Sequence, residues 1–153
     1  VSGLSNGDWI WLDLDDYTTS SYYEEVLHHE FSSSIFRNLS STQQNIWEST
    51  SILWYDTSNE YFLKCLLEFT KFGRLESEFI YEKGFLMNYS RTNRENDFNV
   101  YAQKMFSHPN KLLRISNNYN RIKEKAKKFK ELYRKKGFEG LFPDELDKMS
   151  TSD

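Results

Sequence analysis

His29 and Glu30 are adjacent in a helix-forming stretch, and together these residue types can perform hydrolytic chemistry. In the motif His-Glu-x-x-His, two histidines one helical turn apart hold a zinc ion, and the glutamate activates the zinc-bound water as general base. In this chain the fifth position of the motif is Ser33. The sequence therefore supplies one imidazole and the base, and it lacks the second imidazole at the expected spacing.

We expect a helix from about Ser21 to Asn38 to position these residues. Ser21 and Glu24 have the spacing of a capping box, which satisfies backbone N–H groups at a helix start. Two stripes run along this helix, the first facing the core: Tyr23, Leu27, Phe31 and Ile35 on one side, and Val26, His29, Ser33 and Phe36 on another. A helix with two such sides is expected to be central, with a core behind it and a cleft or second layer in front.

The remaining periodicity predicts a mainly α fold with a small β element, an α+β chain. We expect a strand over Trp9–Leu14 with Ile10, Leu12 and Leu14 on one face, an extended piece at 52–55 and a hairpin at 78–90 that turns at Gly84. A short helix is expected at Gln43–Ser49, and a longer one starts at the capping box Thr57/Glu60, continues through Phe69 and stops near Gly73. A further helix is expected from the capping box Thr92/Glu95 to His108-Pro109. The last helix is expected from Ser116 to Lys136, with a cap at Gly137.

Length and composition predict one domain over residues 1–153, with loose ends at 1–8 and 143–153. The net charge of −3 argues against a general nucleic-acid binder. No apolar run approaches the roughly 20 residues of a membrane span. The single Cys65 excludes an internal disulfide and is expected to be a buried small hydrophobe. The chain begins at Val1 with no signal-peptide pattern, so composition alone predicts no compartment.

Nine basic residues against two acidic ones lie between Arg121 and Lys136. Because they alternate with an apolar stripe, we expect a solvated helix face. The alternative is a docking surface for an anionic partner, whose binding would weaken with salt and with charge reversal at Lys127, Lys128 and Lys130.

Three segments, at 27–32, 84–93 and 95–102, carry a family resemblance. The chain resembles the zinc-binding metallopeptidases that include the substrate-import-associated zinc metallohydrolase lipoproteins, found beside glycan-import systems of gut bacteria. Those proteins read His-His-Glu-Phe-x-His in the first segment and Glu-Asp-Phe in the last, whose Glu is the third zinc ligand. The resemblance implies a zincin-like domain with a central His-Glu helix, metallopeptidase-type hydrolysis, a peptide or protein substrate, and a cell-envelope or secreted location.

Matched residue by residue, the family pattern is incomplete here. His29 takes the place of the first ligand and Glu30 that of the general base, whereas Ser33 stands where the second histidine belongs. Asn96 falls on the third-ligand position; Glu95, one residue earlier, is the remaining metal-ligand candidate, and Asp97 matches the aspartate that follows the ligand. Serine and asparagine are poor neutral donors, so weak zinc binding or none is expected. The Thr92/Glu95 capping box offers a structural role for the same glutamate.

We therefore predict a degenerate metallopeptidase-like protein, with weakened or lost hydrolase activity, that uses the former active-site cleft. One alternative is an active zinc-dependent metallopeptidase with His29 and Glu95 as unorthodox ligands; another is an accessory binding protein of a glycan or nutrient import system. The structural interpretation of these residues is a polar network that joins two helices without binding a ligand: His29, Glu30, Ser33, Asn96 and Asp97.

Three further residue sets are expected to be structural. His28 points about 100° around the helix from His29 and should be a packing or supporting residue. His108, before Pro109, should have a capping or surface role. A nucleophilic serine among Ser32, Ser33 and Ser34 lacks an oxyanion-type glycine turn, so serine catalysis is disfavoured.

Overall fold

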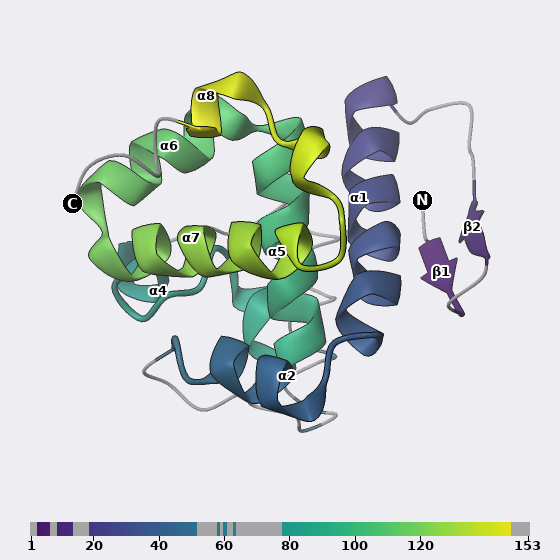
Figure 1. Ribbon diagram of the computed structural model, residues 1–153, viewed down its shortest axis with the longest axis horizontal. Helices are drawn as coiled ribbons and strands as arrows, with labels where there is room; N and C mark the ends of the chain where they lie inside the picture. The colour runs from purple at the N-terminus through teal and green to yellow at the C-terminus, as the bar shows by residue number, and fades with distance from the viewer. Residues whose placement is uncertain are drawn as a thin grey trace.

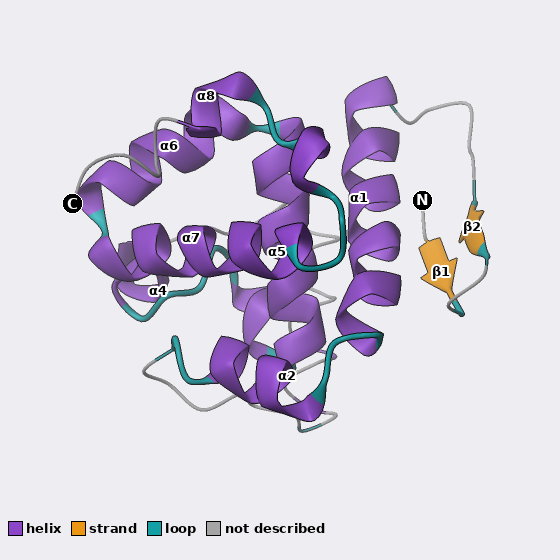
Figure 2. Cartoon of the chain, viewed as in Figure 1, coloured by secondary structure: helices purple, strands orange, loops and turns teal. Residues whose placement is uncertain are grey.

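The structure is a computed structural model that describes residues 3–6, 9–13, 19–51, 58, 60, 63 and 78–147. It is mainly helical with one small sheet, which confirms the predicted fold class at that level (Figure 2). The predicted extended piece at 52–55, the helix from 57 to 73 and Cys65 lie outside the described residues, apart from single positions. In the part that is described, none of the helices combines the length and apolar character needed to cross a bilayer.

Helix α1 (Ser20–Arg37) stands between a β-hairpin on one side and α5 (Arg94–Ser107) on the other (Figure 1). The other elements are β1 (Gly3–Ser5), β2 (Ile10–Leu12), α2 (Ser41–Glu48), α4 (Glu78–Glu82), η1 (Asn88–Arg91), α6 (Pro109–Asn118), α7 (Asn120–Arg134), η2 (Glu139–Leu141) and α8 (Asp144–Asp147). The expectation that the His-Glu helix has neighbours on two sides is confirmed.

The ends of the chain contain more regular structure than the sequence predicted. Gly3–Ser5 pairs antiparallel with Ile10–Leu12, and Leu4 lies opposite Trp11. Ile10 and Leu12 are half-buried while Trp11 is exposed, as the predicted alternation requires. Near the other end, Leu146 on α8 is fully buried.

Helix α1 ends at Arg37 with Asn38 as its C-cap, close to the predicted end, but its start and its core stripe differ from expectation. The helix begins at Ser20, and its N-cap Thr19 makes no side-chain hydrogen bond, so the Ser21/Glu24 capping box is wrong. Leu27 is 43% exposed, whereas Ser33 and Phe36 of the second stripe are buried. In an α-helix, residues four apart are rotated by 400° about the axis, which is 40° more than a full turn. A stripe with only four-residue spacings therefore leaves one face of the helix. A stripe in which spacings of three and four alternate stays on one face.

The predicted hairpin at 78–90 is wrong. This stretch forms α4, a turn and the single turn η1, and the side chains of Phe85, Leu86 and Met87 are buried between them. Gly84 has the expected positive φ of 93°, but it closes α4: its N–H donates to the Tyr81 carbonyl. A short apolar run with a glycine fits a strand and a helix end equally well, so periodicity alone did not separate them.

Helix α5 carries the predicted core residues, because Phe98, Tyr101, Ala102 and Met105 are fully buried. Its N-cap is Asn93, whose side-chain oxygen accepts from the Asn96 N–H at 2.8 Å. The predicted Thr92/Glu95 capping box is therefore wrong. The predicted stop at His108 is confirmed, and Pro109 opens α6, where the missing N–H of proline costs nothing.

The predicted long helix from Ser116 to Lys136 is two helices that meet at Tyr119. Tyr119 has an extended backbone between α6 and α7, in a run of asparagines with low helix propensity. Gly137, at φ 82°, ends α7 as predicted. The apolar side of α7 packs on α5, where Phe129 and Tyr133 join Phe98 and the α2 side chain Trp47 in one aromatic cluster.

Candidate functional site

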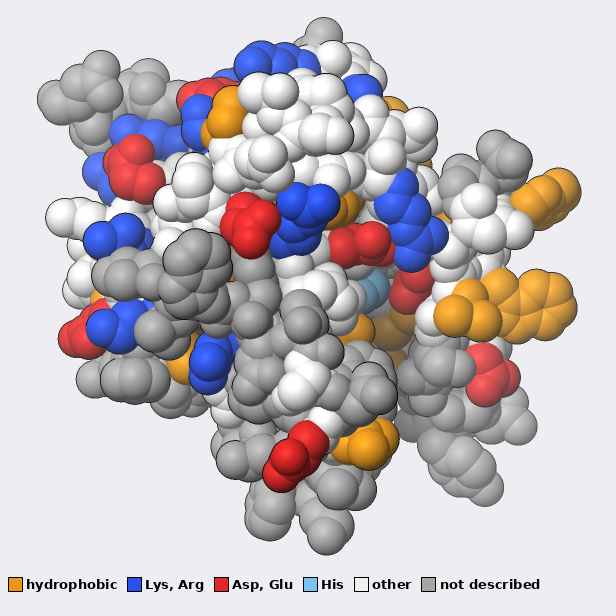
Figure 3. Space-filling view, turned by 90° about the horizontal axis from the view of Figure 1, so that it is seen from below, with side chains coloured by type: hydrophobic (Ala, Val, Ile, Leu, Met, Phe, Trp, Pro, Cys, Tyr) orange, Lys and Arg blue, Asp and Glu red, His pale blue; other side chains and the backbone are white. Residues whose placement is uncertain are grey.

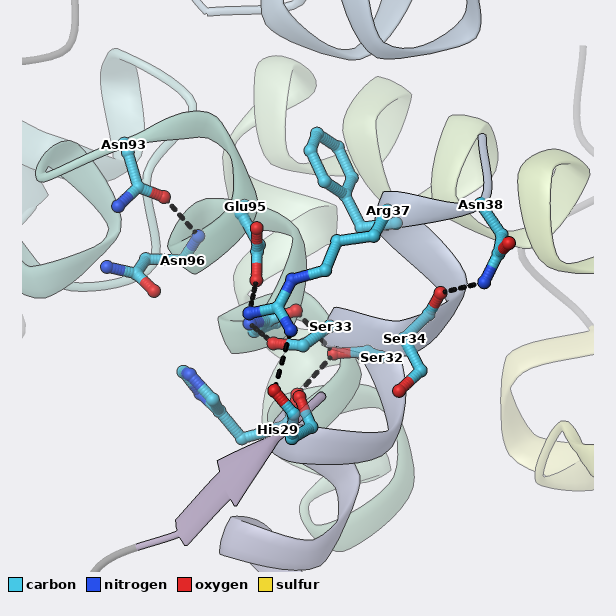
Figure 4. Close-up of polar contacts among 12 residues, drawn as sticks. His29, Ser32, Ser33, Ser34, Arg37, Asn38, Asn93, Glu95 and Asn96 are labelled. Atoms are coloured by element: carbon cyan, nitrogen blue, oxygen red, sulfur yellow. Dashed lines mark hydrogen bonds and ion pairs between the residues drawn. The ribbon is translucent and has the colours of Figure 1, made fainter. Parts of the chain in front are cut away.

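Helix α5 presents a polar stripe to α1 at positions 95, 99 and 103, each four residues from the next. The interface between these two helices contains the polar contacts drawn in Figure 4. It is the place where the sequence predicted a site, because His29 and Ser33 of α1 both lie there.

His29 is a neutral imidazole in this interface. Burial lowers its pKa from 6.5 to about 4, although a hydrogen bond to Gln103 and the charge of Glu95 act in the opposite direction. The Tyr89 ring lies against it, with ring centroids 5.9 Å apart. A neutral imidazole can accept or donate a hydrogen bond, so His29 remains chemically suited to hold a ligand.

Ser33 occupies the position of the missing second histidine, and its hydroxyl is already bound. The Asn99 amide donates to Ser33 Oγ at 2.6 Å, and the Ser32 hydroxyl donates to the Asn99 carbonyl oxygen at 2.7 Å. Ser33 is 2% exposed and Asn99 is 1% exposed. Figure 4 shows the two serines on consecutive positions of α1 turned toward α5. One asparagine side chain therefore bridges two adjacent serines in a buried interface.

Glu95, the second metal-ligand candidate, forms an ion pair instead. The Arg37 guanidinium lies 2.7 Å from Glu95 Oε1, and its other terminal nitrogen donates to the Ser5 carbonyl at 2.7 Å (Figure 4). Arg37 thus joins α1 to both α5 and β1. A carboxylate held by a guanidinium in this way is a weaker candidate for a metal.

Glu30, the predicted general base, faces the hairpin. The pKa of Glu30 is raised, mainly because the side chain is partly buried. The Ser5 hydroxyl and the Arg37 charge oppose this rise in pKa, and the Glu95 charge adds to it. A Cβ atom built on Gly3 would stand 2.7 Å from Glu30 Cγ, so the β1 backbone lies directly on this side chain. Glu30 and His29 therefore contact different neighbours, the first β1 and the second α5.

The predicted five-residue polar network is present only in part. Asn96 donates to Thr92 Oγ1 at 2.7 Å within its own helix start. Asp97 lies on the other side of α5, buried against Lys125 of α7. Asn99, which the sequence did not single out, makes the contacts that were expected of Asn96. The signal that could have found it is the four-residue spacing of Glu95, Asn99 and Gln103 between buried apolar residues.

The other two histidines do not contact the polar stripe of α5 in the described contacts. His28 stacks on Phe106 with centroids 4.7 Å apart, in line with the packing role predicted for it. His108 caps the ends of α5 and α6, and its Nε2 is 2.9 Å from Glu25 Oε1, a contact that the sequence did not predict.

The basic stretch of α7 is less exposed than the sequence indicated. Lys125 and Lys130 are buried, and the Lys130 ammonium donates to the Leu146 carbonyl at 2.7 Å. Lys128 pairs with Glu131 at 2.6 Å. The expected solvated face is thus confirmed only for part of the stretch.

Zinc does not fit the side chains that this interface offers. A hydrolytic zinc site uses three protein ligands and keeps a fourth position for water. Here His29 is one imidazole, the Ser33 hydroxyl is bound to Asn99, and Glu95 is paired with Arg37. Within the described ranges, no three His, Cys, Asp or Glu side chains are grouped closely enough to share a metal ion.

Figure 3 shows a recessed histidine ring with acidic and basic side chains beside it. In the described contacts, the charged groups near His29 are Glu95 and its ion-pair partner Arg37.

No family model matches the chain, and no curated protein and no solved structure is significantly similar to it. The resemblance to zinc metallopeptidases therefore stays a prediction from the sequence.

Proposed function

We propose that this domain is a zincin-like domain without metallopeptidase chemistry, and that the polar interface beside His29 binds a peptide or protein ligand. One observation carries the proposal: the position of the second zinc ligand is a buried serine that Asn99 holds at 2.6 Å. The central place of α1 and the orientation of positions 29 and 33 toward α5 support the zincin-like part. The Glu95 carboxylate near His29 and its partner Arg37 support the binding part, because charged groups can recognise a polar ligand.

An active zinc enzyme with unorthodox ligands is the alternative, and the contacts of Glu95 count against it. To serve as a ligand, Glu95 would have to leave Arg37, with which it forms a charge-assisted pair. The cell-envelope location and the accessory role in glycan or nutrient import follow from the family resemblance, and they remain part of the proposal.

The metal content of the purified chain tests whether the zinc site of a metallopeptidase has been lost. We expect far less than one zinc per chain without chelator, and no difference between wild type and His29→Ala. The double variant Ser33→His/Asn99→Asp returns an imidazole and a carboxylate to facing positions, so it should take up about one zinc per chain. About one zinc in the wild type, lost in His29→Ala, would instead favour the enzyme, and Glu30→Gln in a peptidase assay would then decide.

A displayed random-peptide library tests the binding role. Peptides selected on the wild type should bind Glu30→Gln unchanged, because a binding site needs no general base. Glu95→Lys should weaken the affinity for these peptides at least about tenfold, which corresponds to about 1.4 kcal/mol in binding free energy. Glu48→Lys is the matched control, since Glu48 also pairs with an arginine, Arg94, but lies on α2. Equal loss in both lysine variants would contradict binding beside His29.

A further inference from the structure

We propose that the β-hairpin is a lid on the Glu30 side of this site and that Arg37 is the clasp that holds it. The inference rests on the proposed function, because it assigns a regulation to the same binding site.

The clasp is a single guanidinium that holds two elements at once. One terminal nitrogen of Arg37 donates to the Ser5 carbonyl of β1 at 2.7 Å, and the other lies 2.7 Å from the Glu95 carboxylate of α5. A charged donor makes a stronger hydrogen bond to a carbonyl than a neutral donor does. Arg37 therefore contacts β1 and α5 from one position on α1, and its bond to Ser5 is the one that holds the hairpin.

The backbone of β1 packs closely against side chains of α1. A Cβ atom on Gly3 would meet Glu30 Cγ at 2.7 Å and Val26 Cγ1 at 2.8 Å, distances that real Cβ atoms essentially never show. Only glycine lets β1 approach α1 this closely. The strand thus covers the Glu30 side chain with main chain.

The rest of the hairpin is suited to release. Its strands have three residues each, and a two-stranded hairpin alone is marginally stable in water. Its outer side chains Leu4, Trp9 and Trp11 are 73%, 76% and 73% exposed. In the described structure the hairpin packs mainly on α1, at the edge of the molecule (Figure 1). The Arg37 bond and the Gly3 contact therefore make a large part of what holds it.

Chymotryptic cleavage after Trp9 and Trp11, followed by mass spectrometry on the native full chain, measures release. Arg37→Gln should accelerate cleavage about tenfold, the scale of one lost charge-assisted hydrogen bond. Arg94→Gln, which removes a half-exposed arginine paired with Glu48, should leave the rate unchanged. Glu95→Gln keeps the bond from Arg37 to Ser5 and should also leave it unchanged. Acceleration in Glu95→Gln equal to that in Arg37→Gln would overturn the clasp.

Gly3→Ala tests the lid without changing any charge. The added methyl group should force β1 away from Glu30, accelerate the same cleavages, and raise the rate at which a water-soluble carbodiimide modifies the Glu30 carboxyl group. Glu48, on α2, is the internal control and should keep its rate. A released hairpin with unchanged Glu30 reactivity would refute the lid, and unchanged cleavage in both Gly3→Ala and Arg37→Gln would refute lid and clasp together. Zinc uptake and peptide selection play no part in these measurements, so the lid and the proposed function can fail separately.

Discussion

Position 33 shows how one residue changes the chemistry that a helix can support. An imidazole there would point at α5 beside His29, whereas the serine is short enough to hydrogen-bond to a second helix and close the interface. Glu30 is left with a raised pKa and without a metal-bound water to deprotonate. The same helix face therefore joins two helices instead of activating water.

Asn99 is the residue on which this joint depends. Asn99→Ala removes both hydrogen bonds and leaves two buried hydroxyls with fewer partners, so we expect a loss of about 2–4 kcal/mol in unfolding free energy. Urea denaturation followed by far-UV circular dichroism measures it. Asn96→Ala, on the same helix but bonded only to Thr92 within the described contacts, should lose less than about 1 kcal/mol. Equal losses at both positions would show that the interface does not need the bridge.

At the scale of elements, α5 is held on both sides by polar contacts. Toward α1 it presents the stripe of Glu95, Asn99 and Gln103; toward α7 it presents Asp97, which pairs with the buried Lys125. The Lys125 ammonium also donates to the Gly84 carbonyl at 3.0 Å and to Ser51 Oγ at 2.6 Å. Burial lowers the pKa of Lys125, and the Asp97 charge raises it again. One lysine thus joins α7, α5 and the turn after α4.

Removing Lys125 should damage this junction more than removing the whole pair. Lys125→Met leaves the Asp97 carboxylate buried without its cation, so we expect a loss of about 3–5 kcal/mol in unfolding free energy. The double variant Lys125→Met/Asp97→Leu removes both charges and should recover most of that loss. Urea denaturation of the single and double variants gives the coupling energy. Additive losses would mean that the pair contributes little to the junction.

At the scale of the whole molecule, buried titratable groups on α1 should make stability depend on pH. The pKa of His29 is about 4 in the folded chain and 6.5 when unfolded, so between these values the unfolded chain binds more protons and stability rises with pH. Burial lowers the pKa of His28 as well, which acts in the same direction. The raised pKa of Glu30 acts in the opposite direction, because the folded chain then keeps its proton to higher pH.

Unfolding free energy measured in urea from about pH 7 to about pH 5 tests this dependence. His29 alone should contribute a loss of about 2 kcal/mol as the pH falls over that range. His29→Gln removes the titration and should flatten the curve by that amount, whatever His28 and Glu30 contribute. A curve for His29→Gln parallel to the wild type would contradict a buried neutral histidine at position 29.

The sequence by itself determined the mainly helical class, the central place of the His-Glu helix and the inward residues of α5, because periodic apolar positions report which side of a helix is buried. It also predicted the defect at Ser33, since residue type alone limits metal chemistry. The tertiary structure decided which polar residues contact one another. Asn93 rather than Thr92 caps α5, Asn99 rather than Asn96 meets Ser33, and Asp97 turns to Lys125. One residue along a helix rotates a side chain by about 100°, so the packing of α1 and α7 against α5 selects which polar residue faces which neighbour.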